Sequence, residues 1–362
     1  MKAIIFTGFP GFLGSELVPR VLRRAADAQV ICLVQPRFAA LAKRRANEIE
    51  QSDPSHRGRI RIVEGDITQQ DLGLANAAEL ARDTHEIFHL AAVYDVSVER
   101  ELAMKVNVEG TRNVLAFAER VPDLRRLHHI STCYVSGRYP GRYTERDLDV
   151  GQQFNNAYEE TKFLAEVAVH AAMKSGMKAT VYRPSIVVGD SRTGATQKYD
   201  GPYYVIRWVL RQPKIAIMPV IGRPERFHVN IVPRDYVVGA IDRLSGMDVS
   251  AGKVYQLADP EPLSVDGFLR ALARATQHRI IRIPLPLRIA KEAIDRVPGV
   301  FALMKIPSSV VDYFVHPTEY TNIEAVRDLQ GTAVLPPHVD EYLPTLVDFV
   351  RRHPDITSAA MA

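Results

Sequence analysis

The sequence predicts an α/β fold built on a doubly wound parallel sheet. Short apolar runs alternate with amphipathic, helix-like stretches over the first half of the 362 residues, and glycines cluster directly after the first apolar run. The composition, 46% hydrophobic and 24% charged, is that of a globular protein. Apolar runs separated by helical stretches form parallel strands, and the ligands of such sheets bind at the carboxyl ends of the strands.

The N-terminal stretch sets this pattern. The apolar run Lys2–Phe6 is followed by Gly8, Gly11 and Gly14 and then by an amphipathic helix. Glycine adopts positive φ and lets a phosphate approach the backbone, while a helix N-terminus offers free N–H groups and a partial positive charge to an anion. The arrangement predicts a dinucleotide site. The alternative is a tight turn that only packs a helix on the sheet.

The second predicted strand, 30–34, ends without the acidic side chain that holds the ribose of NAD. Gln35 is neutral and Arg37 is positive, which favours a 2′-phosphate at this position. We therefore expect NADPH to be preferred over NADH, with a solvated surface arginine as the alternative. The third strand, 60–63, leads into a loop at 65–68 against which the adenine is expected to lie.

The remaining elements are expected in a regular order up to Gly189. Further strands are predicted at 87–92, 127–130 and 180–188, with helical stretches from Asn107 and from Ala157. Beyond them the pattern predicts strands at 227–232, 253–257 and 279–283 and helices at 233–244, 264–276 and 339–352. We expect a dinucleotide-binding domain over 1–188 with a return segment at 227–252, a substrate-binding domain from 189–226 and 253–320, and a C-terminal helical region over 321–362.

Composition excludes several classes of function. The net charge of +4 is small and the basic residues are scattered, so nucleic acid is not an expected partner. The two cysteines, Cys32 and Cys133, lie in apolar runs, which fits a reducing compartment. No signal segment and no run of eighteen apolar residues is found, so we expect a cytoplasmic protein that does not span a membrane. No metal-ligand spacing is present, and no metal is expected.

One amphipathic stretch, 284–307, mixes apolar residues with arginine and lysine. It fits a substrate lid, a helix on a membrane surface, or the inner face of a packed helix. These alternatives stay open at this stage, as does the oligomeric state, for which a homodimer is one alternative.

Tyr158 and Lys162 lie four residues apart on a strongly helical stretch and therefore share one face of that helix. A phenol has a pKa near 10, and an adjacent ammonium is expected to lower this pKa into the working range for proton transfer. Thr132, at the end of the fifth strand, offers a hydroxyl that orients a substrate oxygen. The alternative for Tyr158 and Lys162 alone is an incidental surface pair.

Seven motifs together resemble those of an extended short-chain dehydrogenase/reductase. They are TGFPGFLG at 7–14, GDI at 65–67, HLAA at 89–92, NVEGT at 107–111, ISTCYVSG at 130–137, YEETK at 158–162 and RPSIVVG at 183–189. The resemblance implies a Rossmann-type sheet and a catalytic set of Thr132, Tyr158 and Lys162, with Tyr158 and Lys162 also touching the cofactor. It further implies that Gly8, Gly11, Phe12, Leu13 and Gly14 hold the diphosphate, Asp66 and Ile67 flank the adenine, Ala91 and Ala92 line the cofactor, and Pro184 lies near the nicotinamide.

Within that superfamily, the motifs at 7–14, 156–166 and 183–187 are most similar to the fatty-acyl reductase and thioester-reductase branch, which has the male-sterility type of NAD-binding domain. We therefore expect an NADPH-dependent oxidoreductase of lipid metabolism that transfers hydride to the carbonyl of a small apolar substrate: a fatty-acyl thioester, an aldehyde or a ketone. One alternative is an NAD-dependent steroid- or sugar-type dehydrogenase or epimerase. Another, from a different class, is a non-catalytic regulator that senses nucleotides.

Overall fold

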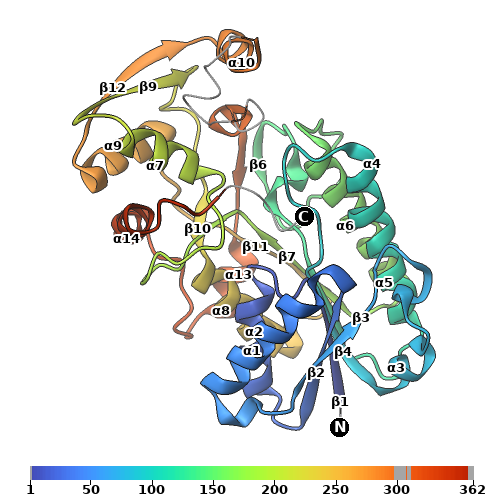
Figure 1. Ribbon diagram of the computed structural model, residues 1–362. Coiled ribbons are helices and arrows are strands. Elements are labelled where there is room, and N and C mark those ends of the chain that lie inside the picture. The colour runs from blue at the N-terminus through green and yellow to red at the C-terminus, as the bar shows by residue number, and fades with distance from the viewer. Residues whose placement is uncertain (1, 297–306, 308–310, 358–362) are drawn as a thin grey trace.

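The computed structural model describes residues 2–296, 307 and 311–357. Its centre is a seven-stranded parallel sheet in the order β11-β7-β5-β4-β1-β2-β3 (Figure 1). The strands are β1 Lys2–Thr7, β2 Ala28–Val34, β3 Ile60–Glu64, β4 Thr84–His89, β5 Arg126–Ile130, β7 Ala179–Pro184 and β11 Val254–Leu257. This architecture confirms the predicted fold class.

Helices cover both faces of the sheet and give three layers (Figure 1). One face carries α1 Gly14–Arg24, α2 Ala39–Ser52, α8 Arg234–Ser245 and α13 Ile323–Leu329, and the other carries α3 Ala77–Asp83, α5 Gly110–Glu119 and α6 Ala157–Lys174. Along β1, Ile4 and Phe6 enter the first core while Ala3 and Ile5 enter the second. Because side chains alternate along a strand, a sheet buried on both faces needs the continuous apolar runs seen in the sequence.

The strand register brings the carboxyl ends of the central strands to one edge. Thr7 is the partner of Leu33 on one side and of His89 on the other. His89 is in turn the partner of His129. The loops that follow β1, β4 and β5 therefore leave the sheet side by side, which positions the predicted site.

A second hydrophobic core lies beside the main sheet. It is formed by α7 Pro202–Leu210, β9 Ile215–Ile221, α9 Val265–Thr276 and α14 Val339–Arg352, with β12 Arg279–Leu285 paired in parallel to β9. In Figure 1 these elements stand apart from the sheet, at the upper left. Two further parallel pairs are β8 Ile186–Val188 with β10 Ile231–Pro233, and β6 Gly141–Tyr143 with β13 Thr318–Tyr320. The C-terminal helix α14 joins this core instead of forming a region of its own.

The predicted strand 180–188 is wrong as a single element, because it divides at Ser185. The Ser185 N–H still donates to the carbonyl oxygen of Leu257 in β11, but the Ile186 N–H turns to Asn230, and β8 pairs with β10 outside the main sheet. The predicted strand at 253–257 is also placed differently. As β11 it pairs with β7 and forms the edge of the main sheet, in contrast to its expected place in the substrate-binding domain.

Three other boundaries differ from the prediction. The strand expected at 227–232 is the shorter β10, Ile231–Pro233. β4 ends at His89 and not at Ala92, because the N–H groups of Leu90 and Ala91 turn to the hydroxyl of Thr7. The helix expected from Asn107 starts earlier, with α4 Arg100–Ala103 and a π-helical turn, η4 Met104–Glu109, before α5. Short 3-10 turns complete the chain: η1 Pro36–Phe38, η2 Pro54–His56, η3 Gln70–Gly73, η5 Cys133–Ser136, η6 Asp248–Ser250 and η7 Asp312–Val315.

The amphipathic stretch 284–307 is described only in part. Residues Leu287–Arg296 form helix α10, and Leu285 and Leu287 pack against Ile221, Val311 and Val315. Residues 297–306 lie outside the described residues, so the choice between lid, surface helix and core stays a prediction. No helix among the described residues is both long enough and apolar enough to cross a membrane.

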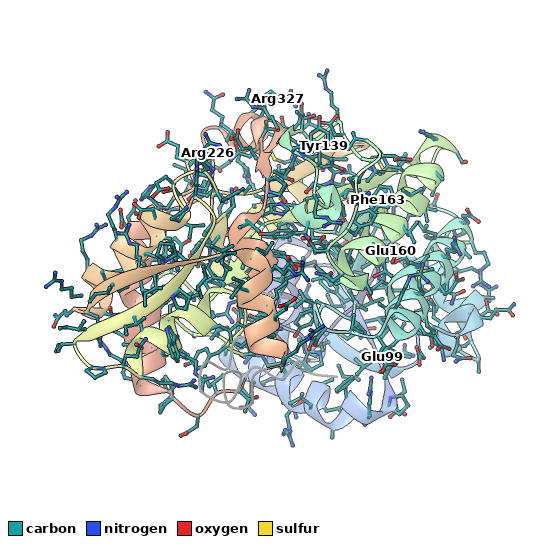
Figure 2. The ribbon with its side chains drawn as sticks, turned by 90° about the horizontal axis from the view of Figure 1, so that it is seen from above. Glu99, Tyr139, Glu160, Phe163, Arg226 and Arg327 are labelled. Carbon is teal, nitrogen blue, oxygen red and sulfur yellow. The ribbon has the colours of Figure 1, made fainter. Side chains whose placement is uncertain are left out.

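Helix α6 has two contrasting sides. On its outer side Glu160 pairs with Arg100, with 2.7 Å between Oε1 and Nη2, and the ring of Phe163 lies 5.2 Å from that of Phe154; Figure 2 labels Glu160 and Phe163. On its inner side Lys162, Ala165, Glu166 and Val169 are buried against the sheet. Three charged residues of this helix, Glu159, Lys162 and Glu166, are buried, which is unusual for charged side chains.

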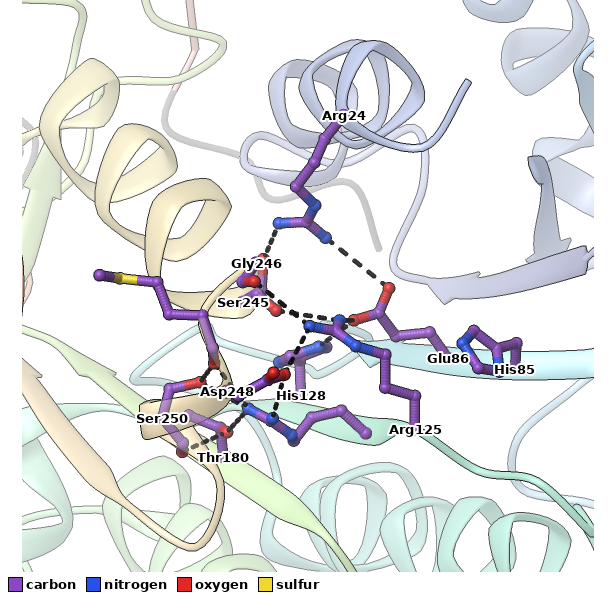
Figure 3. A network of polar contacts seen from close by, with 12 residues as sticks. Arg24, His85, Glu86, Arg125, His128, Thr180, Ser245, Gly246, Asp248 and Ser250 are labelled. Atoms are coloured by element: carbon purple, nitrogen blue, oxygen red, sulfur yellow. Dashed lines mark hydrogen bonds and ion pairs between the residues drawn. The ribbon is translucent and has the colours of Figure 1, made fainter. Parts of the chain in front are cut away.

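A polar network closes the amino-terminal edge of the sheet, away from the predicted site (Figure 3). Glu86 Oε1 accepts hydrogen bonds from Arg125 Nη1 at 2.8 Å and from His128 Nε2 at 2.9 Å, and Arg24 Nη2 lies 3.7 Å from Oε2. Burial raises the pKa of Glu86, but the hydrogen bond from His128 and the neighbouring positive charges outweigh it and hold the pKa at about 2. The network therefore ties helix α1 to strands β4 and β5.

Candidate active site

The loop between β1 and α1 is tight enough to require its glycines. Gly8 has a φ of +86°, and a Cβ there would lie 2.8 Å from the N atom of Ala91. A Cβ on Gly11 or Gly14 would approach the carbonyl oxygen of Gly8 to 2.7 or 2.8 Å. The three glycine positions leave no room for a side chain, so the loop folds back tightly and its backbone can approach a ligand there.

This loop fits the diphosphate of a dinucleotide. The N–H groups of Gly11 and Ser15 bond to carbonyl oxygens of the loop, whereas those of Phe12, Leu13 and Gly14 have no hydrogen-bond partner in the described part of the chain. They stand at the N-terminus of the eleven-residue helix α1, where backbone N–H groups and the helix dipole favour an anion.

Arg234, at the start of α8, adds a positive charge to this end of the site. Its guanidinium carbon lies 5.0 Å from the centre of the Phe12 ring, and its Nη1 lies 3.7 Å from Oε1 of Glu16. The sequence analysis missed Arg234, because nothing in the local pattern relates residue 234 to residue 12. The proximity of α1 and α8 is a property of the folded chain.

Side chains after β2 and β3 meet at the end where the adenosine is expected. Gln35 Nε2 donates to Asp66 Oδ2 at 3.0 Å, and Arg37 Nε donates to Gln35 Oε1 at 3.0 Å. The guanidinium of Arg37 is exposed and lies 4.7 Å from the ring centre of Phe38. Ile67 is buried. The structure thus brings Gln35, Arg37 and Asp66 together.

Thr132 and Tyr158 meet where β5 and β7 end, and Lys162 lies against the last residue of β5. The hydroxyls of Thr132 and Tyr158 are hydrogen-bonded, and Thr132 Oγ1 also donates to the carbonyl oxygen of Pro184 at 3.4 Å. Lys162 Nζ donates to the carbonyl oxygen of Ile130 at 2.8 Å. Ala91 and Ala92 follow β4 at the same edge of the sheet.

Tyr158 is held at the start of α6, where the helix is capped. Asn156 is the N-cap residue, and its Oδ1 accepts a hydrogen bond from the N–H of Glu159 at 3.0 Å. Asn107 supports the same region from the π-helical turn, donating to Thr161 Oγ1 at 3.0 Å and to the carbonyl oxygen of Val93 at 3.0 Å. Asn107 thus joins two segments that lie behind the site, which fits a structural role.

The prediction that Lys162 lowers the pKa of Tyr158 is wrong in direction. Burial of the phenol raises its pKa to about 12, and the hydrogen bond with Thr132 offsets this only in part. Burial also lowers the pKa of Lys162, to about 8, against the opposing charge of Glu166. A phenol with a raised pKa keeps its proton at neutral pH, so Tyr158 is ready to donate that proton.

Aromatic side chains form a wall next to Tyr158. The ring centre of Tyr134 lies 4.9 Å from those of Tyr313 and His316, and the Tyr313 hydroxyl lies 3.0 Å from Asn156 Nδ2. On another side the Lys198 ammonium lies 4.0 Å from the ring centre of Tyr94. Tyr134 and His316 are buried, at 7% and 5% exposure, so these rings pack mainly against one another.

Behind the catalytic candidates lies a buried ion pair that the sequence analysis missed. Glu166 Oε1 is 2.7 Å from Arg183 Nη2, and both side chains have 0% exposure. Ser131, the neighbour of Thr132, donates to Glu166 Oε2 at 2.5 Å. The available signal was spacing, because Glu166 stands four residues after Lys162. No cluster of histidine, cysteine and carboxylate side chains suited to a metal ion occurs in the described ranges.

Comparison with known proteins gives one matching family. A model for an NAD-binding family described as "Male sterility protein" matches residues 6–241. Aldehyde reductase lnaA of Aspergillus flavus is 29% identical over 280 residues, covering 73% of this chain and 26% of that protein. Fatty acyl-CoA reductase wat of Drosophila melanogaster is 24% identical over 291 residues, covering 70% of this chain and 55% of that protein. The chain spans between 5% and 26% of the length of the first curated relatives that it matches.

Among solved structures, the terminal R domain from the myxalamid PKS-NRPS biosynthetic pathway superposes with a TM-score of 0.81. It is 24% identical in sequence, and the match covers 99% of this chain and 93% of that one. The structural likeness extends over both the main sheet and the second core.

Proposed function

Because the chain belongs to the family described as male sterility protein, which consists of NAD(P)-binding reductases of the extended short-chain type, we propose that it is an NADPH-dependent reductase that transfers hydride to a carbonyl carbon. The observation that carries the proposal is the hydrogen bond between Thr132 and Tyr158 at the sheet edge that also bears the glycine loop. A dinucleotide lying along that edge spans from the loop to the two hydroxyls.

Each catalytic residue has a defined task in this proposal. NADPH, when bound, supplies the hydride. Thr132 and Tyr158 hold the oxygen of the substrate carbonyl between their hydroxyls, and Tyr158 donates its proton to that oxygen as negative charge develops there. Lys162 places a positive charge beneath the phenol as the proton leaves. Without a substrate the single O–H donor of Thr132 is bonded to the carbonyl oxygen of Pro184, and it turns to the substrate oxygen when the carbonyl binds.

The preference for NADPH is supported by the side chains at the adenosine end. Arg37 is exposed and has no carboxylate partner among the residues that the structure describes, so its guanidinium is available to a 2′-phosphate. Gln35 takes the place where an acidic residue would bind the ribose hydroxyls, and it holds Asp66 away through a hydrogen bond.

We propose an apolar acyl thioester or an aldehyde as the substrate. The packed rings of Tyr134, Tyr313 and His316 give this side of the site an apolar character. The names of two relatives, an aldehyde reductase and a fatty acyl-CoA reductase, suggest the same substrate class. The second core, with its connection to the sheet through 189–226, is the proposed substrate-binding domain.

The test is a substrate screen that follows NADPH absorbance with octanoyl-CoA, octanal, a ketosteroid and a UDP-sugar. We expect consumption of NADPH with the thioester or the aldehyde. Tyr158→Phe should lower kcat by about a thousandfold and leave NADPH binding, read from its fluorescence, unchanged. Tyr139→Phe, which alters a tyrosine outside the site, is the control. Isomerisation of the UDP-sugar without net NADPH consumption would instead identify an epimerase, and binding without turnover would identify a nucleotide sensor.

A further inference from the structure

The face of α6 that carries Tyr158 and Lys162 continues with two more titratable residues. Tyr158, Lys162, Glu166 and His170 are each four positions apart and therefore form one row along the helix. Lys162 is 4% exposed and Glu166 0%, whereas 26% of the His170 side chain is exposed. The row thus leads from the catalytic phenol to the protein surface.

His129 of β5 lies beneath this row. Leu127 belongs to the core under α6, and the hydroxyl of Ser131 contacts Glu166, so the alternation along β5 directs His129, between them, to the same side. The Lys162 ammonium bonds to the carbonyl of Ile130, the next residue along the strand.

The surroundings of His129 leave its ring unpaired. Its side chain is 0% exposed, and neither ring nitrogen has a hydrogen-bond partner among the described residues. A buried imidazole without partners costs stability, so its presence calls for a function. The titratable groups that face it are Lys162, Glu166 and His170 from α6 and His89 from β4, whose ring centre is 5.4 Å away. Its partner on β7, Val181, is apolar.

The proposed reduction creates a need for protons at this place. Every turnover moves the phenolic proton of Tyr158 to the substrate oxygen, and the phenolate must regain a proton before the next turnover. Lys162 is buried, so protons need a route from solvent to its ammonium. The following inference rests on the proposed function, because it supplies the proton that the reduction consumes.

We propose that His170 and His129 relay protons from solvent to Lys162 and Tyr158. The O–H bond of Tyr158 breaks as an O–H bond forms on the substrate, and the phenolate then takes a proton from the Lys162 ammonium. The resulting amine takes a proton, through a bridging water, from one ring nitrogen of His129, and the other ring nitrogen takes one from His170 in the same way, because neither nitrogen has a direct protein partner among the described residues. His170 recovers its proton from water. No electrons move in these steps.

Glu166 orients this relay and does not carry its protons. Its carboxylate lies 3.3 Å from His170 Nε2 and is held by Arg183 and Ser131. Burial raises the pKa of Glu166, but the Arg183 charge together with the hydrogen bonds holds the pKa well below its usual range, so the carboxylate stays ionised. Burial and the Lys162 charge lower the pKa of His129, which keeps its imidazole neutral, with one donor and one acceptor nitrogen as a relay needs.

The test compares the first turnover with the following ones in His170→Gln and His129→Gln. In a single turnover of NADPH-loaded enzyme on the aldehyde or thioester that the wild type reduces, hydride transfer should keep its wild-type rate, because Tyr158 already holds a proton. Steady-state turnover should fall about tenfold and show a larger solvent isotope effect. His85→Gln, which alters a histidine at the opposite edge of the sheet, is the control.

Two measurements distinguish a proton relay through His129 and His170 from a purely structural role of these residues. Added imidazole should restore steady-state turnover to His170→Ala, whose site opens to solvent, and should leave the wild type unchanged. Nitrogen NMR of histidine-labelled, cofactor-free protein should show the His129 resonances shifting in Lys162→Met and in His170→Gln. The NMR measurement stays informative even if no substrate is turned over. An absence of turnover would contradict only the proposed function and not the relay. Equal slowing of the first and later turnovers, wild-type rates in both variants, or unmoved His129 resonances would overturn the relay.

Discussion

Replacing Lys162 by methionine should make the cofactor-free protein more stable while it abolishes turnover. The pKa of Lys162 falls from its ordinary 10.5 to about 8, a difference of about 2.5 pKa units, because burial disfavours the charged form. At about 1.4 kcal/mol per pKa unit, holding the charge at pH 7 costs about 3 kcal/mol. Methionine keeps most of the volume and loses the hydrogen bond to Ile130, which is worth about 1 kcal/mol. The expected net gain is about 2 kcal/mol.

The pH dependence of the stability difference between the wild type and Lys162→Met is the sharper test of this prediction. The unfolded chain keeps the proton on Lys162 up to about pH 10.5, whereas the folded protein releases it above about pH 8. The unfolded state therefore binds more protons between these values, and the stability of the wild type relative to Lys162→Met should rise with pH from about 8 to 10.5. The advantage of the variant should accordingly be full at pH 7 and shrink by pH 10.

Urea titrations of the cofactor-free proteins at pH 7 and at pH 10 measure both effects as free energies of unfolding. Lys174→Met is the matched control, because Lys174 is exposed in the last turn of the same helix. A Lys162→Met protein that is less stable than the wild type at pH 7, or whose advantage does not change with pH, would show that the Lys162 charge is not desolvated as described.

Three other changes test the site and its frame. Gly8→Ala should lower NADPH affinity at least tenfold and stability by more than about 2 kcal/mol, because its Cβ would lie 2.8 Å from the N atom of Ala91. Gly58→Ala is the control: Gly58 also has a positive φ but faces open space, so this change should lower stability by only about 1 kcal/mol. Arg37→Ala should raise the KM for NADPH about tenfold and leave that for NADH unchanged, as steady-state kinetics with both cofactors would reveal; an equal rise for both would contradict the proposed 2′-phosphate contact. Glu86→Gln should lower stability at pH 7 by about 3 kcal/mol, and because its pKa falls from 4.5 to about 2, the difference in unfolding free energy should diminish as the pH drops below 4.5.

The fold could be predicted from the sequence where local patterns determine it. The apolar runs of β1 to β5 are long enough to be buried on both faces, and the glycine turn before α1 has a geometry that few other residues allow. Tyr158 and Lys162 were found because helical spacing puts them on one face. Each of these features is fixed within about a dozen consecutive residues.

The remainder depends on contacts between distant segments. Whether 254–257 joins the main sheet is decided by its pairing with β7, some seventy residues earlier in the chain, and not by its own sequence. The approach of Arg234 to Phe12 and the burial of His129 under α6 arise in the same way. The direction of the Tyr158 pKa was missed because burial, the largest cause of the raised pKa, is a property of the folded protein.

The burial that costs stability at Lys162 also sets the chemistry of Tyr158. Enclosing the phenol raises its pKa to about 12, so the proton stays on Tyr158 until a substrate oxygen needs it. The same enclosure lowers the pKa of Lys162 to about 8, close to the pH at which it must release and regain protons. Glu166 supplies the negative charge that this arrangement requires, because one buried carboxylate faces the two buried cations Lys162 and Arg183. A more exposed site would be more stable, but it would hold the proton less firmly on Tyr158 and more firmly on Lys162.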